Sequence, residues 1–392
     1  MIRSRPVVSL SFSLSFVPDI RFGIGTASGL ADAVSSFGGI STVALVIDGF
    51  LAKSGLADSI KAGLSACGVE TRIFDDFAGE PKIAHLRAAT ALARGAEMVV
   101  GLGGGSALDI AKIVACTAAS GEDPMHYALA ANPLPKAPLK KIMVPTTAGT
   151  GSEASASNIF AGPAGKKLWI WGAETKADLI LLDPALTATL PPALTAWCGL
   201  DAFVHAFEAA TNRNAHRGAQ LYAHQALRLI TGALETAVGA PDDMAARGDM
   251  LLGSCYAGIA IDNCGTAIAH NISHALAGLA PVHHGLATAL AFEATLPWLV
   301  EAGTADLDAA AKACGLASAA QLPAFLSDFM DRCGIARALP AAFDGFSARQ
   351  LADEMRAVEN QPMRRSTVRD VTDADIDRFA DQMMALPKGV QQ

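Results

Sequence analysis

The sequence predicts two domains, a Rossmann-like α/β domain with a mostly parallel sheet over residues 1–191 and an all-helical domain over residues 192–392. In the first half, short apolar runs alternate with helical patterns of about ten to fifteen residues, which is typical of βα units. After about Pro192 nearly every segment favours a helix, and no convincing strand remains. We place the boundary at Leu190-Pro191-Pro192, where this pattern changes.

The strands of the first half are predicted from short apolar runs bounded by turn signals. The clearest covers residues 42–47 and is closed by Asp48. Two helical patterns stop at Gly68 and Gly95, because glycine readily adopts the left-handed conformation that ends a helix. The predicted strands cover residues 42–47, 69–74, 98–100, 142–144 and 179–182, and the predicted helices cover residues 56–66 and 83–94.

The chain starts with two arginines followed by an apolar run with interspersed serines. Secretory signal peptides also start in this way, but no A-x-A cleavage site follows here. The alternation from Val8 to Phe16 is typical of a strand, and we predict the first β-strand there. Residues 158–171 predict a hairpin, because Gly-Pro-Ala-Gly at residues 162–165 is a turn signal between two apolar runs.

The composition indicates an acidic protein that is poor in charged residues. Charged side chains make up 17% of the chain, against a usual share of about 25%. The net charge of −8 offers no basic surface for nucleic acid, and no run of about 18 apolar residues predicts a membrane-spanning helix. The seven cysteines are scattered without a C-x-x-C motif, which favours reduced thiols in a cytoplasmic protein.

A glycine-rich loop, residues 103–106, follows the third predicted strand and opens a helix. Glycines let the backbone approach a phosphate closely, and a helix N-terminus presents free N–H groups to it. We expect Ser106 to cap the helix and Asp109 to complete a capping box. The loop lacks the full G-x-G-x-x-G fingerprint, so a purely structural tight turn is the alternative.

A second polar loop, PTTAGTGSE at residues 145–153, follows the next strand and offers four hydroxyls and two glycines. A bound dinucleotide requires such loops at the carboxyl ends of neighbouring parallel strands. Asp48 also closes a strand, and a carboxylate in that position accepts hydrogen bonds from the adenosine ribose and repels a 2′-phosphate. These features favour NAD over NADP, whereas the alternative for Asp48 is a simple turn residue.

Five of the nine histidines fall in two segments, GLDAFVHAFEA and AHNISHALAGLAPVHHG. Residues four apart in a helix lie on the same face. The pairs Asp201/His205 and His270/His274 therefore each point two metal-binding side chains in one direction. For either pair alone, the alternative is a hydrogen bond on a helix surface.

Two adjacent histidines, His283 and His284, lie near the end of the second segment. Either would supply a further ligand, and spacing alone does not choose between them. Imidazole combined with carboxylate suits divalent iron, zinc or manganese. The sequence therefore predicts a divalent metal site in the helical half.

Five ordered motifs resemble the signatures of the iron-containing (group III) alcohol dehydrogenases: GGGSALDIAK, PTTAGTGSE, DPALTATLPP, GLDAFVHAFEA and HNISHALAGLAPVHHG. The likeness runs from Phe22 to the segment near Glu359 and so covers almost the whole chain. It implies a dinucleotide domain followed by a helical metal domain, with catalysis in the cleft between them.

The resemblance also implies roles for individual residues. The family's ligand histidine directly precedes a glycine, which selects His284 over His283, and His274 takes a polar role near the metal. Lys167 resembles a family lysine near the nicotinamide ribose. The implied metal ligands are Asp201, His205, His270 and His284, and the implied nucleotide contacts are Asp48, Gly104, Gly105, Ser106, Asp109, Thr146, Thr147, Thr150 and Lys167.

Some positions depart from the family pattern. The family usually has proline where His283 stands and a second glycine where Ala277 stands. His283 therefore adds a titratable group beside the metal loop. We expect Asn271, between two site histidines, to narrow or polarise the pocket. None of the four ligand positions is lost.

These features predict a metal-dependent, NAD(H)-linked alcohol dehydrogenase that transfers a hydride between a small alcohol and the nicotinamide. The metal is expected to act as a Lewis acid on the substrate oxygen. We expect His274 to pass on the alcohol proton, because an unperturbed imidazole pKa of about 6.5 is close to working pH. The alternative for His274 is a hydrogen-bonded histidine on the helix surface.

Other functions remain as alternatives. A lyase of the dehydroquinate-synthase type would regenerate NAD internally, and a metal-free enzyme resembling maleylacetate reductases would survive chelators. A catalytically silent nucleotide-binding protein is a third alternative, against which the intact ligand set argues. We expect a small alcohol or aldehyde substrate, Fe²⁺ with Zn²⁺ as the second choice, a homodimer, and neither a nucleic-acid nor a membrane partner.

Overall fold

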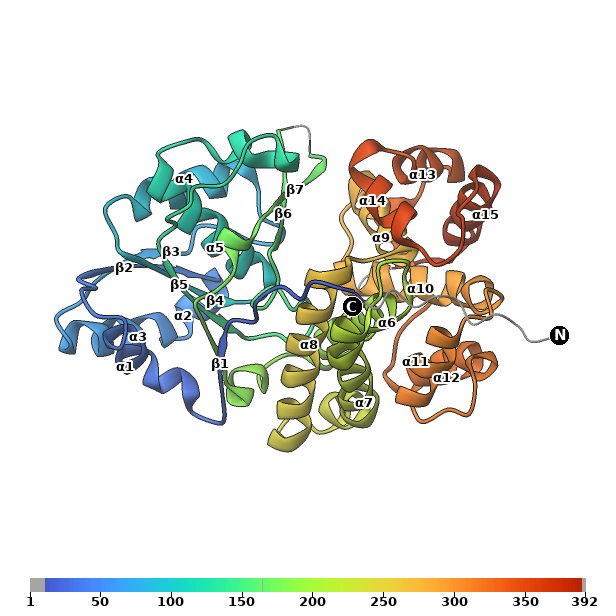
Figure 1. Cartoon of the computed structure of the whole chain (residues 1–392), viewed down its shortest axis with the longest axis horizontal. Helices are drawn as coiled ribbons and strands as arrows, with labels where there is room; N and C mark the ends of the chain where they lie inside the picture. Colours follow the sequence, from blue (N-terminus) through green and yellow to red (C-terminus); the bar gives the residue numbers. More distant parts are fainter. Residues whose placement is uncertain (1–10, 164, 390–392) are drawn as a thin grey trace.

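The computed structural model describes residues 11–163 and 165–389. Figure 1 shows a sheet with helices α1 to α5 at one end of the molecule and helices α9 to α15 at the other. The sheet has the strand order β1-β8-β5-β4-β2-β3, and all neighbouring strands are parallel, which confirms the predicted α/β class. Its strands are β1 (Asp19–Phe22), β2 (Thr42–Ile47), β3 (Glu70–Phe74), β4 (Met98–Gly103), β5 (Lys140–Pro145) and β8 (Leu179–Leu182).

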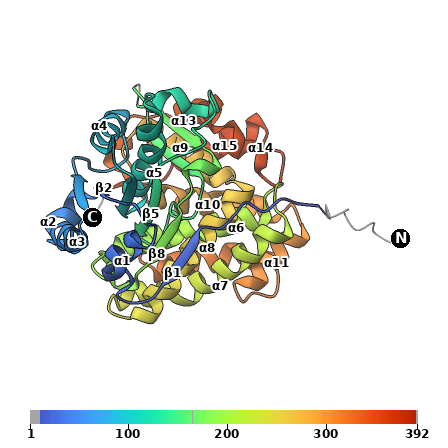
Figure 2. The ribbon, with the colours of Figure 1, turned by 60° about the vertical axis from the view of Figure 1, so that its left-hand side comes forward.

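Helices cover both faces of this sheet, so its central strands are buried on both sides. Side chains alternate between the faces: Val46 of β2 packs on the side of α4 and α5, and Leu45 packs on the side of α1 and α3. Figure 2 shows the strands between these two groups of helices. The helices are α1 (Leu30–Ser35), α2 (Gly49–Lys53), α3 (Leu56–Ala66), α4 (Ile83–Ala93) and α5 (Gly105–Ser120).

The predicted hairpin is present, with β6 (Ser157–Ala161) antiparallel to β7 (Lys167–Trp171). The position predicted for the first strand is wrong. Residues 1–10 lie outside the described residues, and residues 11–18 form no strand, so β1 begins only at Asp19. Side chains hold this segment in place of a neighbouring strand, since Asn263 accepts the backbone N–H of Ser15 at 2.8 Å.

From α6 onward the described chain is helical apart from a short parallel pair, β9 (Leu339–Pro340) with β10 (Lys388–Gly389). A domain boundary after residue 191 stays a prediction. The helices are α6 (Pro192–Thr211), α7 (Arg217–Gly239), α8 (Met244–Cys264), α9 (Ile268–Leu279), α10 (His284–Val300), α11 (Ala305–Ala313), α12 (Leu322–Arg332), α13 (Ala348–Met355), α14 (Gln361–Ser366) and α15 (Asp373–Met384).

The seven cysteines are all free, and only Cys67 is exposed. Burial raises the pKa of the Cys116 thiol to about 12, which makes it unreactive at neutral pH. Within residues 11–163 and 165–389, no helix has both the length and the apolar character needed to span a bilayer.

Candidate metal centre and nucleotide-binding loops

Asp201, His205, His270 and His284 converge, with one ligand atom from each lying within 4.8 Å of the others. Asp201 and His205 lie one turn apart on α6, His270 lies in the first turn of α9, and His284 is the first residue of α10. Oδ1 of Asp201 is 3.7 Å from Nε2 of His270 and 3.6 Å from Nε2 of His284. The structure therefore brings together the four residues that the resemblance implied as ligands.

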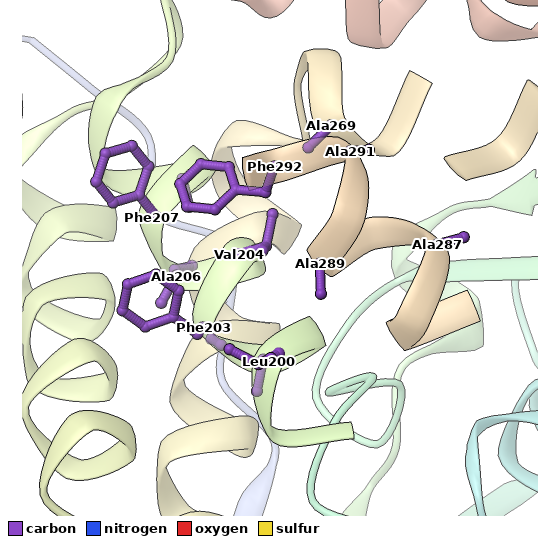
Figure 3. Close-up of a cluster of buried hydrophobic side chains, with 14 of the residues drawn as sticks. Leu200, Phe203, Val204, Ala206, Phe207, Ala269, Ala287, Ala289, Ala291 and Phe292 are labelled. Atoms are coloured by element: carbon purple, nitrogen blue, oxygen red, sulfur yellow. The ribbon is translucent and has the colours of Figure 1, made fainter. Parts of the chain in front are cut away.

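An apolar cluster fixes the helices that carry these side chains. Phe203 and Phe207 of α6 pack against Phe292 of α10, with ring centroids 6.1 and 4.9 Å from that of Phe292. Figure 3 shows the three rings gathered beside small side chains such as Ala269 of α9 and Ala289 of α10. Because alanines let helix backbones approach closely, the ligand positions are set by a tightly packed core.

The polar atoms at this point fit a divalent cation. Oδ1 of Asp201 and Nε2 of His270, which lie 3.7 Å apart, are buried and have no hydrogen-bond partner. Leaving a buried polar atom unsatisfied costs about 1–3 kcal/mol. A set of one carboxylate and three imidazoles that share one point suits a divalent first-row metal.

The protonation states of three of the four side chains also suit a metal. Burial lowers the pKa of His205 to about 4, and burial lowers the pKa of His284 well below 6.5. Burial disfavours the Asp201 carboxylate, but the surrounding histidines outweigh it and lower its pKa. Metal binding needs neutral imidazole and ionised carboxylate, and these three side chains are already in that state.

Glu208, which the sequence analysis missed, holds His270 in place. Nδ1 of His270 lies 2.7 Å from Oε2 of Glu208, and the carboxylate also accepts the N–H groups of Ala267 and Ala269 at 2.6 and 2.8 Å. Although burial lowers the pKa of His270, Glu208 and Asp201 outweigh it and raise the value to about 9 in the metal-free protein. The sequence could have indicated Glu208, because it lies two turns after Asp201 on α6, and residues two turns apart in a helix share a face.

The structure selects His284 as the ligand and gives a steric reason for the glycine that follows it. His284, not His283, belongs to the converging set. A Cβ added at Gly285 would lie 2.2 Å from the backbone oxygen of Trp197 on α6. Only glycine therefore fits directly after the ligand at the start of α10.

In the sheet-containing half of the molecule, β4 ends at Gly103 and α5 begins at Gly105. The N-cap of α5 is Gly104, and no side chain caps the helix. The predicted Ser106 cap and the capping box with Asp109 are therefore wrong, because the extended backbone of Gly104 starts the helix before Ser106. The first-turn N–H groups lack a side-chain partner, which fits a phosphate-bearing ligand.

The two polar loops pack directly on each other. A Cβ added at Gly105 would lie 2.7 Å from Cγ2 of Thr150, and one at Gly104 would lie 3.4 Å from Cγ2 of Thr147. The backbone N–H of buried Thr146 donates to the Gly103 oxygen at 2.9 Å. The predicted loop residues thus form one backbone-rich surface at the carboxyl ends of β4 and β5.

Asp48 lies beside this surface, since a Cβ added at Gly103 would be 3.6 Å from the Cβ of Asp48. Its carboxylate caps α2 by accepting the backbone N–H of Phe50 at 2.8 Å. Asp48 is thus a helix cap at the end of β2, and its position next to the glycine loop also suits a contact with a ribose.

Family comparisons agree with this arrangement. Residues 18–184 match the iron-containing alcohol dehydrogenase model, and residues 195–374 match the model of the family's C-terminal part. The chain belongs to the iron-containing alcohol dehydrogenase family. This confirms the resemblance inferred from the motifs.

Individual relatives from this family match most of the chain. It is 34% identical to long-chain-alcohol dehydrogenase 1 of Geobacillus thermodenitrificans, over 70% of each chain. It is 33% identical to 1,3-propanediol dehydrogenase of Klebsiella pneumoniae, over 70% of this chain and 72% of that one. The crystal structure of sulfoacetaldehyde reductase from Bifidobacterium kashiwanohense in complex with NAD⁺ superposes with a TM-score of 0.87 at 25% identity, over 96% of this chain and 99% of that chain.

Two departures from the family pattern have different surroundings. The ring of His283 lies against Trp197, with centroids 4.9 Å apart, and its Nδ1 is buried without a partner. Asn271 is fully buried, and its amide donates to the backbone oxygens of Met355 and Asn360 at 3.0 Å each. Asn271 therefore ties α9 to the following helical segments, in place of the pocket role that we expected.

His274 lies one turn after His270, and its ring centroid is 5.6 Å from that of His284. Burial first, and then the nearby Lys167, lower the pKa of His274 well below 6.5. The expectation of an unperturbed imidazole is therefore wrong. His274 is therefore neutral at neutral pH.

Both carboxylate oxygens of Asp109 accept hydrogen bonds from other parts of the chain. Its Oδ1 accepts from Oγ of Ser152 at 2.5 Å, and its Oδ2 accepts the backbone N–H of Ile159 at 2.9 Å. Nζ of Lys112 is 3.7 Å from Oδ1. We therefore expect Asp109 to support the second loop, in place of the direct nucleotide contact that the resemblance implied.

Lys167 lies on β7 with a buried side chain, and its Nζ is 2.6 Å from Oε1 of Glu80. The preceding Lys166 pairs with Glu359 at 3.3 Å, which links the hairpin to the helical half. Lys167 also influences the pKa of both His274 and His284, so it lies near the ligand cluster. Glu80 is a second residue that sequence reasoning did not single out.

Replacing Glu208 by Gln is expected to weaken metal binding about 10- to 100-fold without removing a ligand, because outer carboxylates orient ligating histidines. Competition with a chelator measures this affinity. Glu235→Gln is the matched control, since Glu235 pairs with Arg332 at the surface of α7. Equal affinity in the two variants would contradict the role of Glu208.

Glu153, at the end of the second loop, is a buried carboxyl whose Oε1 has no partner. Burial raises its pKa from 4.5 to about 7. A raised carboxyl pKa means that the folded state binds the proton more tightly, so stability falls as pH rises from 4.5 to about 7.

Glu153→Gln removes this penalty and is expected to stabilise the protein by about 3 kcal/mol at pH 8, with little effect near pH 4.5. Thermal midpoints at the two pH values measure the difference. The exposed Glu122→Gln is the control. A gain that is equal at both pH values would refute the assignment.

Proposed function

We propose that this family member is a metal-dependent, NAD(H)-linked alcohol dehydrogenase or aldehyde reductase for a small alcohol or aldehyde. The observation that carries the proposal is the convergence of Asp201, His205, His270 and His284 within 4.8 Å. This cluster adjoins the second polar loop, because Nδ1 of His205 lies 3.4 Å from the Gly149 oxygen. Metal and nucleotide sites that share a loop support hydride transfer between them.

These four residues would hold a divalent ion, which would supply a Lewis acid for the substrate oxygen, and a bound nicotinamide would supply the hydride chemistry. Glu208 orients the imidazole of His270 through its Nδ1. The neutral imidazole of His274 takes the proton that the alcohol loses on oxidation and returns it on reduction. The first turn of α5, with no side-chain cap, binds the phosphates through backbone N–H groups.

The finer assignments belong to the same proposal. Asp48 favours NAD over NADP because its carboxylate would repel a 2′-phosphate. Fe²⁺ is the expected ion and Zn²⁺ the alternative, since a carboxylate with three imidazoles accepts both. We further propose a cytoplasmic homodimer, in which the seven free cysteines stay reduced.

The test is NADH formation at about 340 nm with a panel of primary alcohols and diols. Two named relatives motivate the inclusion of 1,3-propanediol and, in the reverse direction, sulfoacetaldehyde. The enzyme is assayed after metal removal and again after addition of Fe²⁺ or Zn²⁺. Activity that returns only with metal supports the proposal.

Two other outcomes would overturn it. Activity that is indifferent to metal would favour a metal-free reductase, with the histidines as substrate contacts. Bound nucleotide without NADH production under any condition would favour a lyase that regenerates NAD internally.

A further inference from the structure

Lys112 is a fully buried lysine on α5 that fastens the second polar loop. Its side chain is 0% exposed. Nζ donates to the backbone oxygens of Ser152, Ser155 and Ser157 at 2.7, 3.0 and 2.9 Å. The three hydrogens of the ammonium are thereby used, and its charge is balanced by Asp109 at 3.7 Å. One cation therefore holds the end of the loop and the segment that leads from it into β6.

This loop contacts both halves of the proposed active site. On the metal side, the Gly149 oxygen lies 3.4 Å from Nδ1 of His205. On the nucleotide side, Thr150 packs over Gly105, where an added Cβ would lie 2.7 Å from its Cγ2. Between these contacts, Gly151 presses against Gly258 of α8 so closely that an added Cβ would be 2.5 Å from its Cα. This close packing fixes the loop between its contact on the metal side and its contact on the nucleotide side.

Helix α5 connects these features in one rigid element. Its first residue, Gly105, belongs to the glycine loop, and Lys112 follows two turns later. Asp109 lies between them, and its carboxylate accepts a hydrogen bond from the hydroxyl of Ser152 in the second loop at 2.5 Å. A ligand that orders the start of α5 therefore also orders the loop that touches His205.

We propose that Lys112 is a positioning residue that couples nucleotide binding to metal binding through residues 146–157. The inference rests on the proposed function, because it requires that both ligands bind. NADH tightens the metal site by holding the Gly149 carbonyl against His205, and the metal tightens the nucleotide site in return. Such coupling is reciprocal, so both affinities change by the same factor, here about tenfold.

The experiment measures Zn²⁺ affinity by chelator competition with and without NADH, and NADH affinity by its fluorescence with and without Zn²⁺. Lys112→Met is expected to bind each ligand alone but to lose the tenfold coupling. Lys141→Met is the matched control. Lys141 is a lysine 3% exposed at the amino end of β5, where it donates to the Leu139 oxygen at 3.2 Å.

A merely structural role would lower the stability of both lysine variants and leave the coupling factor unchanged. If Lys112→Met does not fold, Ser152→Ala serves as the second variant. It removes the hydrogen bond between the loop and Asp109 and is expected to reduce the coupling between the metal and NADH affinities. Wild-type protein that binds Zn²⁺ and NADH independently would overturn the inference, as would coupling retained in the Lys112 and Ser152 variants. Failure to bind either ligand would overturn the proposed function itself.

Discussion

Asp201→Asn is expected to abolish metal retention and to lower turnover by at least about a thousandfold. Asp201 is the one anionic member of the ligand set, and its Oδ1 faces Nε2 of both His270 and His284. A Lewis acid contributes several kcal/mol to transition-state stabilisation, and each 1.36 kcal/mol is about tenfold in rate. Metal content per chain and turnover with the best alcohol of the panel measure the two effects.

The binding of NADH separates loss of the metal from loss of the fold. Asp201→Asn is expected to bind NADH with an affinity lowered only by the lost coupling, about tenfold. Asp370→Asn is the control, because Asp370 pairs with Arg213 on the surface with its side chain 90% exposed. Normal metal content in Asp201→Asn would show that the metal binds elsewhere.

Gly285→Ala is expected to weaken metal binding about 100-fold while leaving every ligand in place. The added Cβ would lie 2.2 Å from the Trp197 oxygen and 2.7 Å from its carbonyl carbon, so the start of α10 must move away from α6. His284 moves with it, and disturbing the orientation of a ligand histidine typically costs about 10- to 100-fold in metal affinity. Overpacking also lowers stability by about 1–3 kcal/mol.

Chelator competition measures the metal affinity of this variant, and thermal unfolding measures its stability. Gly232→Ala is the matched control, because Gly232 lies within α7 and an added Cβ there would meet nothing within 4 Å. That variant is expected to gain about 0.5–1 kcal/mol, as is usual for alanine in a helix interior. Wild-type metal affinity in Gly285→Ala would show that α10 does not position His284.

Segments whose local pattern and tertiary setting agree were predicted well. Residues 42–47 and 179–182 form strands with the predicted bounds, because both are buried continuously within a parallel sheet. The helix over residues 56–66 also has its predicted bounds, and Gly68 follows it with φ +78°. The spacing of four between Asp201 and His205 was informative for the same reason, since a helix is a regular local structure.

Features that depend on contacts far apart in the sequence were not predictable. The alternation from Val8 to Phe16 is typical of a strand, yet residues 11–18 have no strand beside them and are held by side chains. Asp109 looked like a capping residue, but its carboxylate accepts hydrogen bonds from Ser152 of the next loop and from Ile159 of β6. Lys112 ends the motif GGGSALDIAK, but its contacts were not predictable, because the three oxygens that it binds lie about forty residues away in the chain.

The central claim is that Asp201, His205, His270 and His284 hold one divalent ion. Crystals grown with Zn²⁺ and measured on both sides of the zinc absorption edge test it directly. We expect one anomalous peak about 2.0–2.2 Å from an oxygen of Asp201 and a nitrogen of each histidine. No peak at this point in protein that needs Zn²⁺ for activity, or a peak bound by other residues, would contradict the claim.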